Sequence, residues 1–349
     1  MTSHALRWQH GSATILPTAA MLADCTFLLN GKPFSPFAHA PWMGTIRDRS
    51  IIGHLRELGG DFVGVPFGGN LPPADGPEAW RSAAQHPRVH PIHGPSGDSD
   101  WTIVHADDAS VTLALDYPEF YPVSRLERTI AARPDTPALD FTLVVHARHA
   151  AEMAIGLHPM FRMPEQRGDL VLSADFAFGL THPRQTAAGQ GQEFGDLSAV
   201  PQGDSTVDLT RPPLTEPHLN VQLCGMRGSI SGSYTTENAG FVLDWDRALL
   251  PSLQIWHTDR GIDGPPWNGQ YRGLGLEPIA AAFDFPNAVS VGPNPINARG
   301  VATAVSIHPE TPLVIRHSIL AFTGAAPWTA VPIGERAKAR KITALSAHS

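Results

Sequence analysis

Two histidines and one glutamate stand out as groups that could transfer protons, because each lies beside turn or aromatic residues. They are His93 in PIHGPSG, His158 in GLHPMFRMP and Glu277 in GLGLEPIAAAFDFPN. His158 follows an apolar run and precedes a proline, which is typical of a strand ending at the rim of a sheet, where functional groups collect. Glu277 lies in an apolar segment, so its carboxylate needs a partner or a raised pKa. A fold that unites these residues would hold a general acid and a general base.

The composition indicates a protein built mainly from β-strands. The 349 residues include 33 Pro and 32 Gly, more than long helices tolerate. A formal net charge of −8 without a basic run argues against nucleic acid as a partner. Cys25 and Cys224 are too few for a disulfide framework, and we expect both to be reduced and buried. We find no apolar run long enough for a membrane span and no signal peptide, so the sequence predicts a cytoplasmic protein without membrane contact.

Short alternating apolar runs recur along the chain and are separated by turn residues. The clearest antiparallel series is Ser110 to Asp116, Ser124 to Ala131 and Leu139 to Val145. The other predicted strands are Ala13 to Leu16, Thr26 to Leu29, Trp101 to His105, Met153 to Leu157, Leu170 to Leu172, Gly240 to Asp244, Ser252 to Trp256, Val301 to Ile307 and Leu313 to Phe322. Many short strands at near-regular spacing predict an all-β fold, a large antiparallel β-sandwich with few short helices.

Few segments read as helices or as independent units. Ile51 to Leu58 predicts a helix ended by Gly59 and Gly60, and a second short helix is predicted after Pro77. Residues 185–219 are rich in Gly, Gln, Thr and Pro and are predicted to be irregular. Because we find no repeat and no linker, we predict a single domain over 1–349, with a core at about 10–325 and a flexible tail at 334–349.

The three motifs, taken in chain order, resemble the aldose 1-epimerase (galactose mutarotase-like) family. The resemblance lies in HG at His93, in HP followed by Met and Phe at His158, and in LEP followed by PN at Glu277. The flanking SRLERTI and PSLQIWHTDRG resemble family segments as well, so the similarity spans roughly residues 10–325. It implies the galactose mutarotase-like supersandwich, whose concave face binds a sugar.

The resemblance also implies a role for each residue. His158 would be the general acid that protonates the ring oxygen, Glu277 the general base that takes the anomeric hydroxyl proton, and His93 a substrate-binding group near the reacting centre. The expected activity is an isomerase that interconverts the α and β anomers of a monosaccharide or sugar derivative. Such chemistry needs no metal and no other cofactor. We expect the acid and the base to face each other across a cleft as wide as a pyranose ring, and a homodimer is compatible with the sequence.

Further sugar contacts are predicted from aromatic and acidic side chains near these motifs. Trp256, Phe161 and Trp267 could stack on a sugar face. Asp259 and Asp263, in the loop after LQIWHT, could bind hydroxyl groups. Each of these residues also has an ordinary structural interpretation, in the core for the aromatic rings and in solvent for the acids.

The chain departs from the family in the segment VPFGGNLPP. Many members resemble NRFGGRI there, with arginines where this chain has Pro66 and Asn70. Asn70 is therefore the expected substrate contact in place of an arginine clamp. The acid that binds sugar hydroxyls in the family has no clear match, and Glu216 and Asp244 are the candidates. The acid and base pair is retained while the substrate clamp is changed.

Three alternative functions stay open at this point. A non-catalytic carbohydrate-binding relative would keep the fold without the reaction. A hexose-6-phosphate 1-epimerase would need cations for the phosphate, for which Arg162 and Arg167 are candidates. A metal site is the least favoured, because its candidate histidines lack a familiar spacing. Those histidines are His86, His90, His93, His146 and His149.

Overall fold

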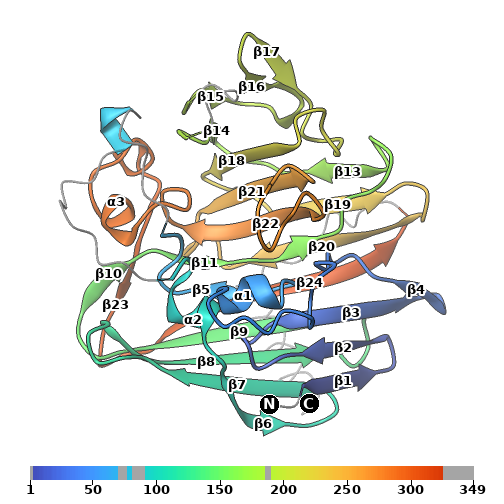
Figure 1. Cartoon of the computed structure of the whole chain (residues 1–349), viewed down its shortest axis with the longest axis vertical. Helices are drawn as coiled ribbons and strands as arrows, with labels where there is room; N and C mark the ends of the chain where they lie inside the picture. The colour runs from blue at the N-terminus through green and yellow to red at the C-terminus, as the bar shows by residue number, and fades with distance from the viewer. Residues whose placement is uncertain (1–2, 70–76, 81–90, 185–189, 325–349) are drawn as a thin grey trace, which may run out of the picture.

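Two large antiparallel sheets form the body of the computed structural model, which describes residues 3–69, 77–80, 91–184 and 190–324 (Figure 1). The sheet that carries the candidate site, here called the site sheet, runs in the spatial order β15 (Glu193–Phe194), β14 (Phe178–Thr181), β18 (His218–Cys224), β21 (Ser252–Asp259), β22 (Arg272–Ala280), β11 (Ile155–Leu157) and β5 (Val63–Gly64), with β12 (Met160–Phe161) also paired to β22. The second sheet, the back sheet, runs in the order β13 (Leu170–Ser173), β19 (Ile230–Tyr234), β20 (Ala239–Trp245), β24 (Leu313–Thr323), β9 (Ala138–Ala147), β8 (Val123–Ala132), β7 (Ser110–Asp116) and β6 (Thr102–Ala106).

Smaller sheets extend this sandwich. The N-terminal sheet consists of β1 (His4–Trp8), β2 (Gly11–Ile15), β3 (Leu22–Leu29) and β4 (Lys32–Phe34), drawn in blue in Figure 1. Single bridges from Leu22 to Asp61 and from Phe37 to Phe161 join its end to the site sheet. The remaining pairs are β10 (Ala151–Met153) with β23 (Val305–Ile307) and β16 (Val200–Gln202) with β17 (Ser205–Val207).

The helices of the described chain are short. They are α1 (Gly53–Arg56), α2 (Gly94–Asp98) and α3 (Asn287–Val291), with 3-10 turns η1 (Glu78–Trp80), η3 (Leu197–Ala199) and η4 (Asn297–Arg299). The helix predicted over Ile51 to Leu58 is therefore wrong in length, because Ile52 has an extended ψ of 142° and Glu57 already leaves the helical conformation. Beyond η1, the helix predicted after Pro77 lies outside the described residues. No helix among the described residues has the length and apolar character to cross a membrane.

One hydrophobic core lies between the two sheets and decides which residues face the site. Leu253 and Ile255 on β21 and Leu274 and Leu276 on β22 are fully buried in a cluster that also contains side chains of the back sheet. Successive side chains of a strand point to opposite faces. Gln254 of β21 and Glu277 of β22, which are paired with each other and neighbour these leucines and isoleucine, must therefore lie on the outer face of the site sheet. The alternation that builds the core therefore also builds the site.

The all-β class and the antiparallel sandwich predicted from the sequence are confirmed. Strand β7 has the predicted bounds, whereas the run Met153 to Leu157 divides into β10 and β11, which belong to different sheets. The segment 185–219 is not wholly irregular, because it contains β15, β16, β17 and the first residues of β18. The predicted tail at 334–349 lies outside the described residues.

A buried ionic cluster ties the edge of the site sheet to the back sheet. Asp61 accepts a hydrogen bond from Arg128 of β8 at 2.6 Å and contacts His317 of β24 at 3.0 Å, and all three side chains are almost fully buried. Arg128 also donates to the backbone oxygen of Ala20. This cluster fixes the segment that leads to Phe62, which supports the candidate site described next.

Candidate active site

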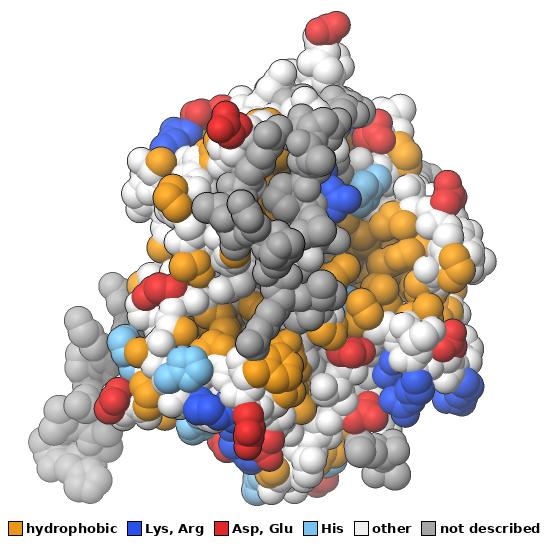
Figure 2. Space-filling model, turned by 60° about the vertical axis from the view of Figure 1, so that its left-hand side comes forward, with side chains coloured by type: hydrophobic (Ala, Val, Ile, Leu, Met, Phe, Trp, Pro, Cys, Tyr) orange, Lys and Arg blue, Asp and Glu red, His pale blue; other side chains and the backbone are white. Residues whose placement is uncertain are grey.

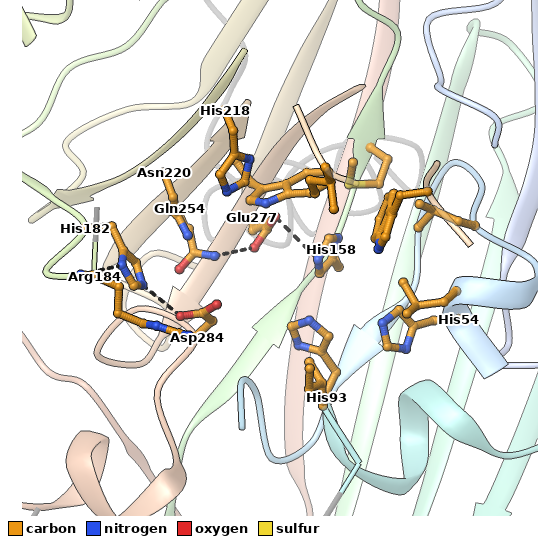
Figure 3. Close-up of a pocket in the computed structure, with 17 residues that line it drawn as sticks. His54, His93, His158, His182, Arg184, His218, Asn220, Gln254, Glu277 and Asp284 are labelled. Atoms are coloured by element: carbon orange, nitrogen blue, oxygen red, sulfur yellow. Dashed lines mark hydrogen bonds and ion pairs between the residues drawn. The ribbon is translucent and has the colours of Figure 1, made fainter. Parts of the chain in front are cut away.

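A cavity of about 470 Å³ opens on the outer face of the site sheet. Residues from β18, β21 and β22 form its floor, and Figure 3 shows their side chains converging on it. His158, Glu277, His93 and Trp256, four of the predicted site residues, line this cavity. Its volume lies within the range of small-molecule binding sites.

His158 and Glu277 are in direct contact. The His158 Nε2 atom lies 3.4 Å from Glu277 Oε1, and the two residues are 8% and 1% exposed (Figure 3). Gln254, opposite Glu277 in the register of β21 and β22, donates from Nε2 to Glu277 Oε2 at 3.0 Å. The separation by a pyranose width expected from the sequence is not observed. The two groups lie close enough together to reach two oxygens that are bonded to one carbon.

Glycines beside Glu277 explain how its carboxylate lies flat on the sheet. A Cβ atom at Gly275 would lie 2.2 Å from Glu277 Oε1, so the glutamate folds back over the position that lacks a side chain. Gly273 accommodates the ring of Tyr271 in the same way, with its phenol oxygen 2.6 Å from the would-be Cβ. The alternating glycines of GLGLE therefore position the carboxylate.

His158 is positioned by its backbone and by ring stacking. It follows β11, and its N–H donates to the Phe62 oxygen at 2.9 Å. The imidazole stacks on the Phe62 ring at 4.2 Å between centroids, and the His54 ring also stacks on Phe62, at 4.8 Å. An apolar support of this kind orients the imidazole and keeps water from it.

Two further histidines face the cavity with defined tautomers. His54 Nδ1 lies 3.1 Å from the Gly97 carbonyl oxygen, which can only accept, so the neutral ring offers Nε2 as an acceptor. His93 Nδ1 accepts from the Gly68 N–H at 3.3 Å, so its neutral ring carries the proton on Nε2. His93 has a left-handed backbone with φ 64° at the start of α2, and its ring meets that of His158 edge-on at 4.9 Å.

Burial dominates the electrostatics of the acid and base pair. Burial, with His54 as a smaller cause, lowers the pKa of His158 from 6.5 to about 3. Burial also raises the pKa of Glu277 well above its ordinary value, aided by the charge of Asp284 and opposed by the hydrogen bond from Gln254. Both shifts favour the uncharged pair, with the imidazole neutral and the carboxyl protonated. Perturbed acids and bases of this kind are typical of active sites.

A second polar group lies at the other end of the cavity. His182 contacts Asp284 Oδ1 through Nε2 at 2.9 Å, while its Nδ1 accepts from the Arg184 N–H at 3.0 Å (Figure 3). Arg184, His218 and Asn220 line the same end. None of these residues was predicted from the sequence. The polar positions within the apolar strand HLNVQLC are a signal that could have identified Asn220, whereas nothing local identifies Asp284.

Several predicted contacts lie away from the cavity. Asp259 pairs with Arg272 at 2.6 Å and does not line the cavity. Phe161 is fully buried and stacks between Phe37 and Phe241 in the core. Trp267 does line the cavity. Asn70 lies outside the described residues.

The other candidates are occupied elsewhere in the fold. Asp244, on β20 of the back sheet, accepts from Ser229 and Arg247, and Glu216 accepts from Gln202 at 3.1 Å. Arg162 pairs with Glu237 and lies over the Tyr234 ring, so it does not face the cavity as a phosphate ligand. Arg167 and Asp263 are not among the cavity residues either.

The metal hypothesis gains no support from the described residues. Within the ranges that the structure covers, no group of three or more His, Cys, Asp or Glu side chains is arranged to hold a metal ion. His86 and His90 lie outside those ranges. Cys25 and Cys224 are free and buried, as predicted.

Comparison with solved structures identifies the fold. An aldose epimerase homologue from C. elegans aligns with a TM-score of 0.63 and 14% identity, over 93% of this chain and 99% of that one. A galactose mutarotase-related enzyme from Lactobacillus acidophilus aligns with a TM-score of 0.59 and 13% identity, over 93% and 98%. The chain has the galactose mutarotase-like fold. A galactose mutarotase-like protein from Clostridium acetobutylicum aligns similarly, with a TM-score of 0.60 and 12% identity, over 91% and 94%. No family model and no curated protein matches the sequence.

Proposed function

We propose that this protein is an aldose 1-epimerase-like isomerase that interconverts the α and β anomers of a sugar. The observation that carries the proposal is the contact between His158 Nε2 and Glu277 Oε1 at 3.4 Å inside the cavity. Anomer exchange moves one proton off O1 and one proton onto the ring oxygen, and both oxygens belong to one carbon. An acid and a base in contact with each other can reach both. The galactose mutarotase-like fold supports this activity, and the residues give it a mechanism.

In the proposed reaction, Glu277 accepts the O1 proton while His158 donates a proton to the ring oxygen. The C1–O1 bond becomes a carbonyl as the bond from C1 to the ring oxygen breaks. Rotation about the C1–C2 bond presents the other carbonyl face, and closure returns both protons. No electrons are gained or lost, so these steps require no redox cofactor.

A proton transferred from Glu277 explains how a buried imidazole can act as an acid. In the free site burial lowers the pKa of His158 and raises that of Glu277, so it favours the neutral imidazole and the protonated carboxyl. A bound sugar supplies hydroxyl donors to the carboxylate, and hydrogen bonds to the charged form of a carboxylate lower its pKa. We therefore propose that substrate binding moves the proton from Glu277 to His158, which makes the base and the acid in one step. The net charge of the pair does not change.

Neighbouring residues support the two reacting groups. Gln254 holds Glu277 Oε2 and leaves its own Oε1 without a hydrogen-bond partner, ready to accept from a sugar hydroxyl. His93 lines the cavity beside His158, with its ring held by the hydrogen bond from the Gly68 N–H to Nδ1. Trp256 offers an aromatic face beside them.

The proposal is tested by measuring α and β exchange by polarimetry or NMR over a panel of free and phosphorylated sugars. We expect catalysed exchange with at least one sugar, and a loss of about 10²-fold or more in Glu277→Gln and His158→Asn, since an isostere keeps the shape and removes the proton transfer. Equal rates for the wild type and both variants would refute the catalytic assignment. Sugar binding without exchange would instead identify a carbohydrate-binding protein.

A further inference from the structure

The two ends of the cavity differ in chemistry on either side of the acid and base pair. The polar end consists of His182, Arg184, His218, Asn220 and Asp284. The other end, here called the aromatic end, consists of Leu55, Leu58, Met160, Trp256, Ile262 and Trp267. In Figure 3 His182, Arg184 and Asp284 lie on one side of the pair, and His54 lies on the other.

The aromatic end is one continuous apolar surface. Leu58 and Met160 belong to a cluster that also contains Trp42 and Tyr271 and packs against Trp256 and Trp267. The Trp267 ring lies 5.4 Å from Trp42 and 5.7 Å from Trp256 between centroids. Figure 2 shows hydrophobic side chains gathered in a hollow on this side of the molecule. These residues come from α1, β12, β21 and the loop before β22, so they enclose a volume and do more than offer one flat face.

Within the described part of the chain, few side-chain atoms at the aromatic end can form hydrogen bonds with a ligand. The Trp42 indole N–H already donates to the Leu55 oxygen. The six side chains themselves offer only the indole N–H donors of Trp256 and Trp267 and no acceptor. The polar side chains at the border of this end are His54 and His218, whose ring meets that of Trp256 at 5.9 Å between centroids. A hydroxyl buried without its partners is costly, whereas a methyl or larger apolar group in the same place is favourable.

We propose that the sugar taken by this site carries an apolar group on the ring carbon bonded to the ring oxygen, and that this group occupies the aromatic end. The smallest such sugars are 6-deoxyhexoses, in which a methyl group replaces a hydroxymethyl group. The inference rests on the proposed function, which sets the anomeric carbon at His158 and Glu277. The ring hydroxyls then meet the polar end. The substituent beside the ring oxygen is the one free to turn toward Met160 and Trp267.

The test compares matched sugars that differ only in the hydroxyl at C6. Suitable pairs are 6-deoxy-D-glucose with D-glucose, D-fucose with D-galactose, and L-rhamnose with L-mannose. We expect kcat/KM for anomer exchange to favour the deoxy sugar by about tenfold or more in the pair whose ring configuration fits. In Trp267→Ala that ratio should fall toward one. Trp8→Ala, which removes a tryptophan of the N-terminal sheet far from the cavity, should keep the ratio of the wild type.

Binding separates the inference from the proposed function. Tryptophan fluorescence titration or calorimetry measures the affinity for the same pairs whether or not exchange is catalysed. Tighter binding of the deoxy sugar supports the inference even if no sugar is turned over, in which case only the proposed function fails. Turnover of both members with equal kcat/KM, equal affinity within each pair, or no binding of any of the sugars would overturn the inference.

Discussion

Substitution of Gly275 by alanine is expected to disable the site without unfolding the protein. The added Cβ would lie 2.2 Å from Glu277 Oε1, and real Cβ contacts are not found below 3.0 Å. The carboxylate must therefore move by close to 1 Å, which changes its position relative to both His158 and the Gln254 donor. A misplacement of that size can cost about 10²-fold in rate. We expect kcat to fall by roughly this factor while KM changes by less than about threefold.

The stability of the folded protein should change much less than its activity. Gly275 lies in a strand and has no positive φ, so alanine fits its backbone and reduces the freedom of the unfolded chain. We expect the free energy of unfolding, measured in urea, to change by less than about 1 kcal/mol. Gly195→Ala is the matched control, because a Cβ there meets nothing within 4 Å.

A double substitution identifies the cause of the loss. If alanine at position 275 acts through the glutamate, Gly275→Ala should add little to the loss already caused by Glu277→Gln, since contacting residues are not additive. Full activity in a folded Gly275→Ala protein would refute the reasoning. So would equal additional losses in the presence and absence of the Glu277 carboxylate.

Three other predictions concern the pair and its support. Gln254→Leu removes a hydrogen bond that favours the charged carboxylate, so kcat should fall about tenfold and the alkaline limb of the pH profile should move up; an unmoved limb would contradict this. In the wild type, kcat/KM at pH 4 should stay within about twofold of its value at pH 6. The pair binds a second proton, and so loses its base, only near the His158 pKa of about 3. An enzyme whose base had the ordinary pKa of 4.5 would already lose about fourfold in kcat/KM at pH 4. On the alkaline side, kcat/KM should fall as the pH passes the raised pKa of Glu277. Asp61→Ala should cost about 3–5 kcal/mol in urea unfolding by leaving Arg128 buried and unpaired, whereas exposed Asp116→Ala should cost less than about 1 kcal/mol.

Local patterns predicted the fold class but not every strand. Alternation predicted the bounds of β7 correctly because its two faces differ, one toward the core and one toward solvent. Strand β22 was not predicted, because both of its faces are buried and two glycines interrupt its pattern. The strand that carries Glu277 therefore looked like an apolar segment. The glycines that obscured the strand are the ones that position the carboxylate.

The predicted residues that lie in motifs come together in the structure. His93, His158 and Glu277 were found through their order in the chain, and all three line the cavity. Asp259 was predicted from its loop position, whereas in the structure it pairs with Arg272 on the neighbouring strand and does not line the cavity. Register, which a single sequence does not reveal, decides that pairing.

Unsatisfied polar atoms around the cavity explain why such a site is built on a sheet. His158 Nδ1, Gln254 Oε1 and Glu277 Oε1 are buried without hydrogen-bond partners in the described structure. Each such atom costs about 1–3 kcal/mol, so a flexible loop would turn these groups toward water or toward one another. Strands β21 and β22, fixed from behind by the core, hold them in place. A sugar that supplies the missing hydrogen bonds recovers that cost on binding, and the same bonds stabilise the charged carboxylate that the reaction needs.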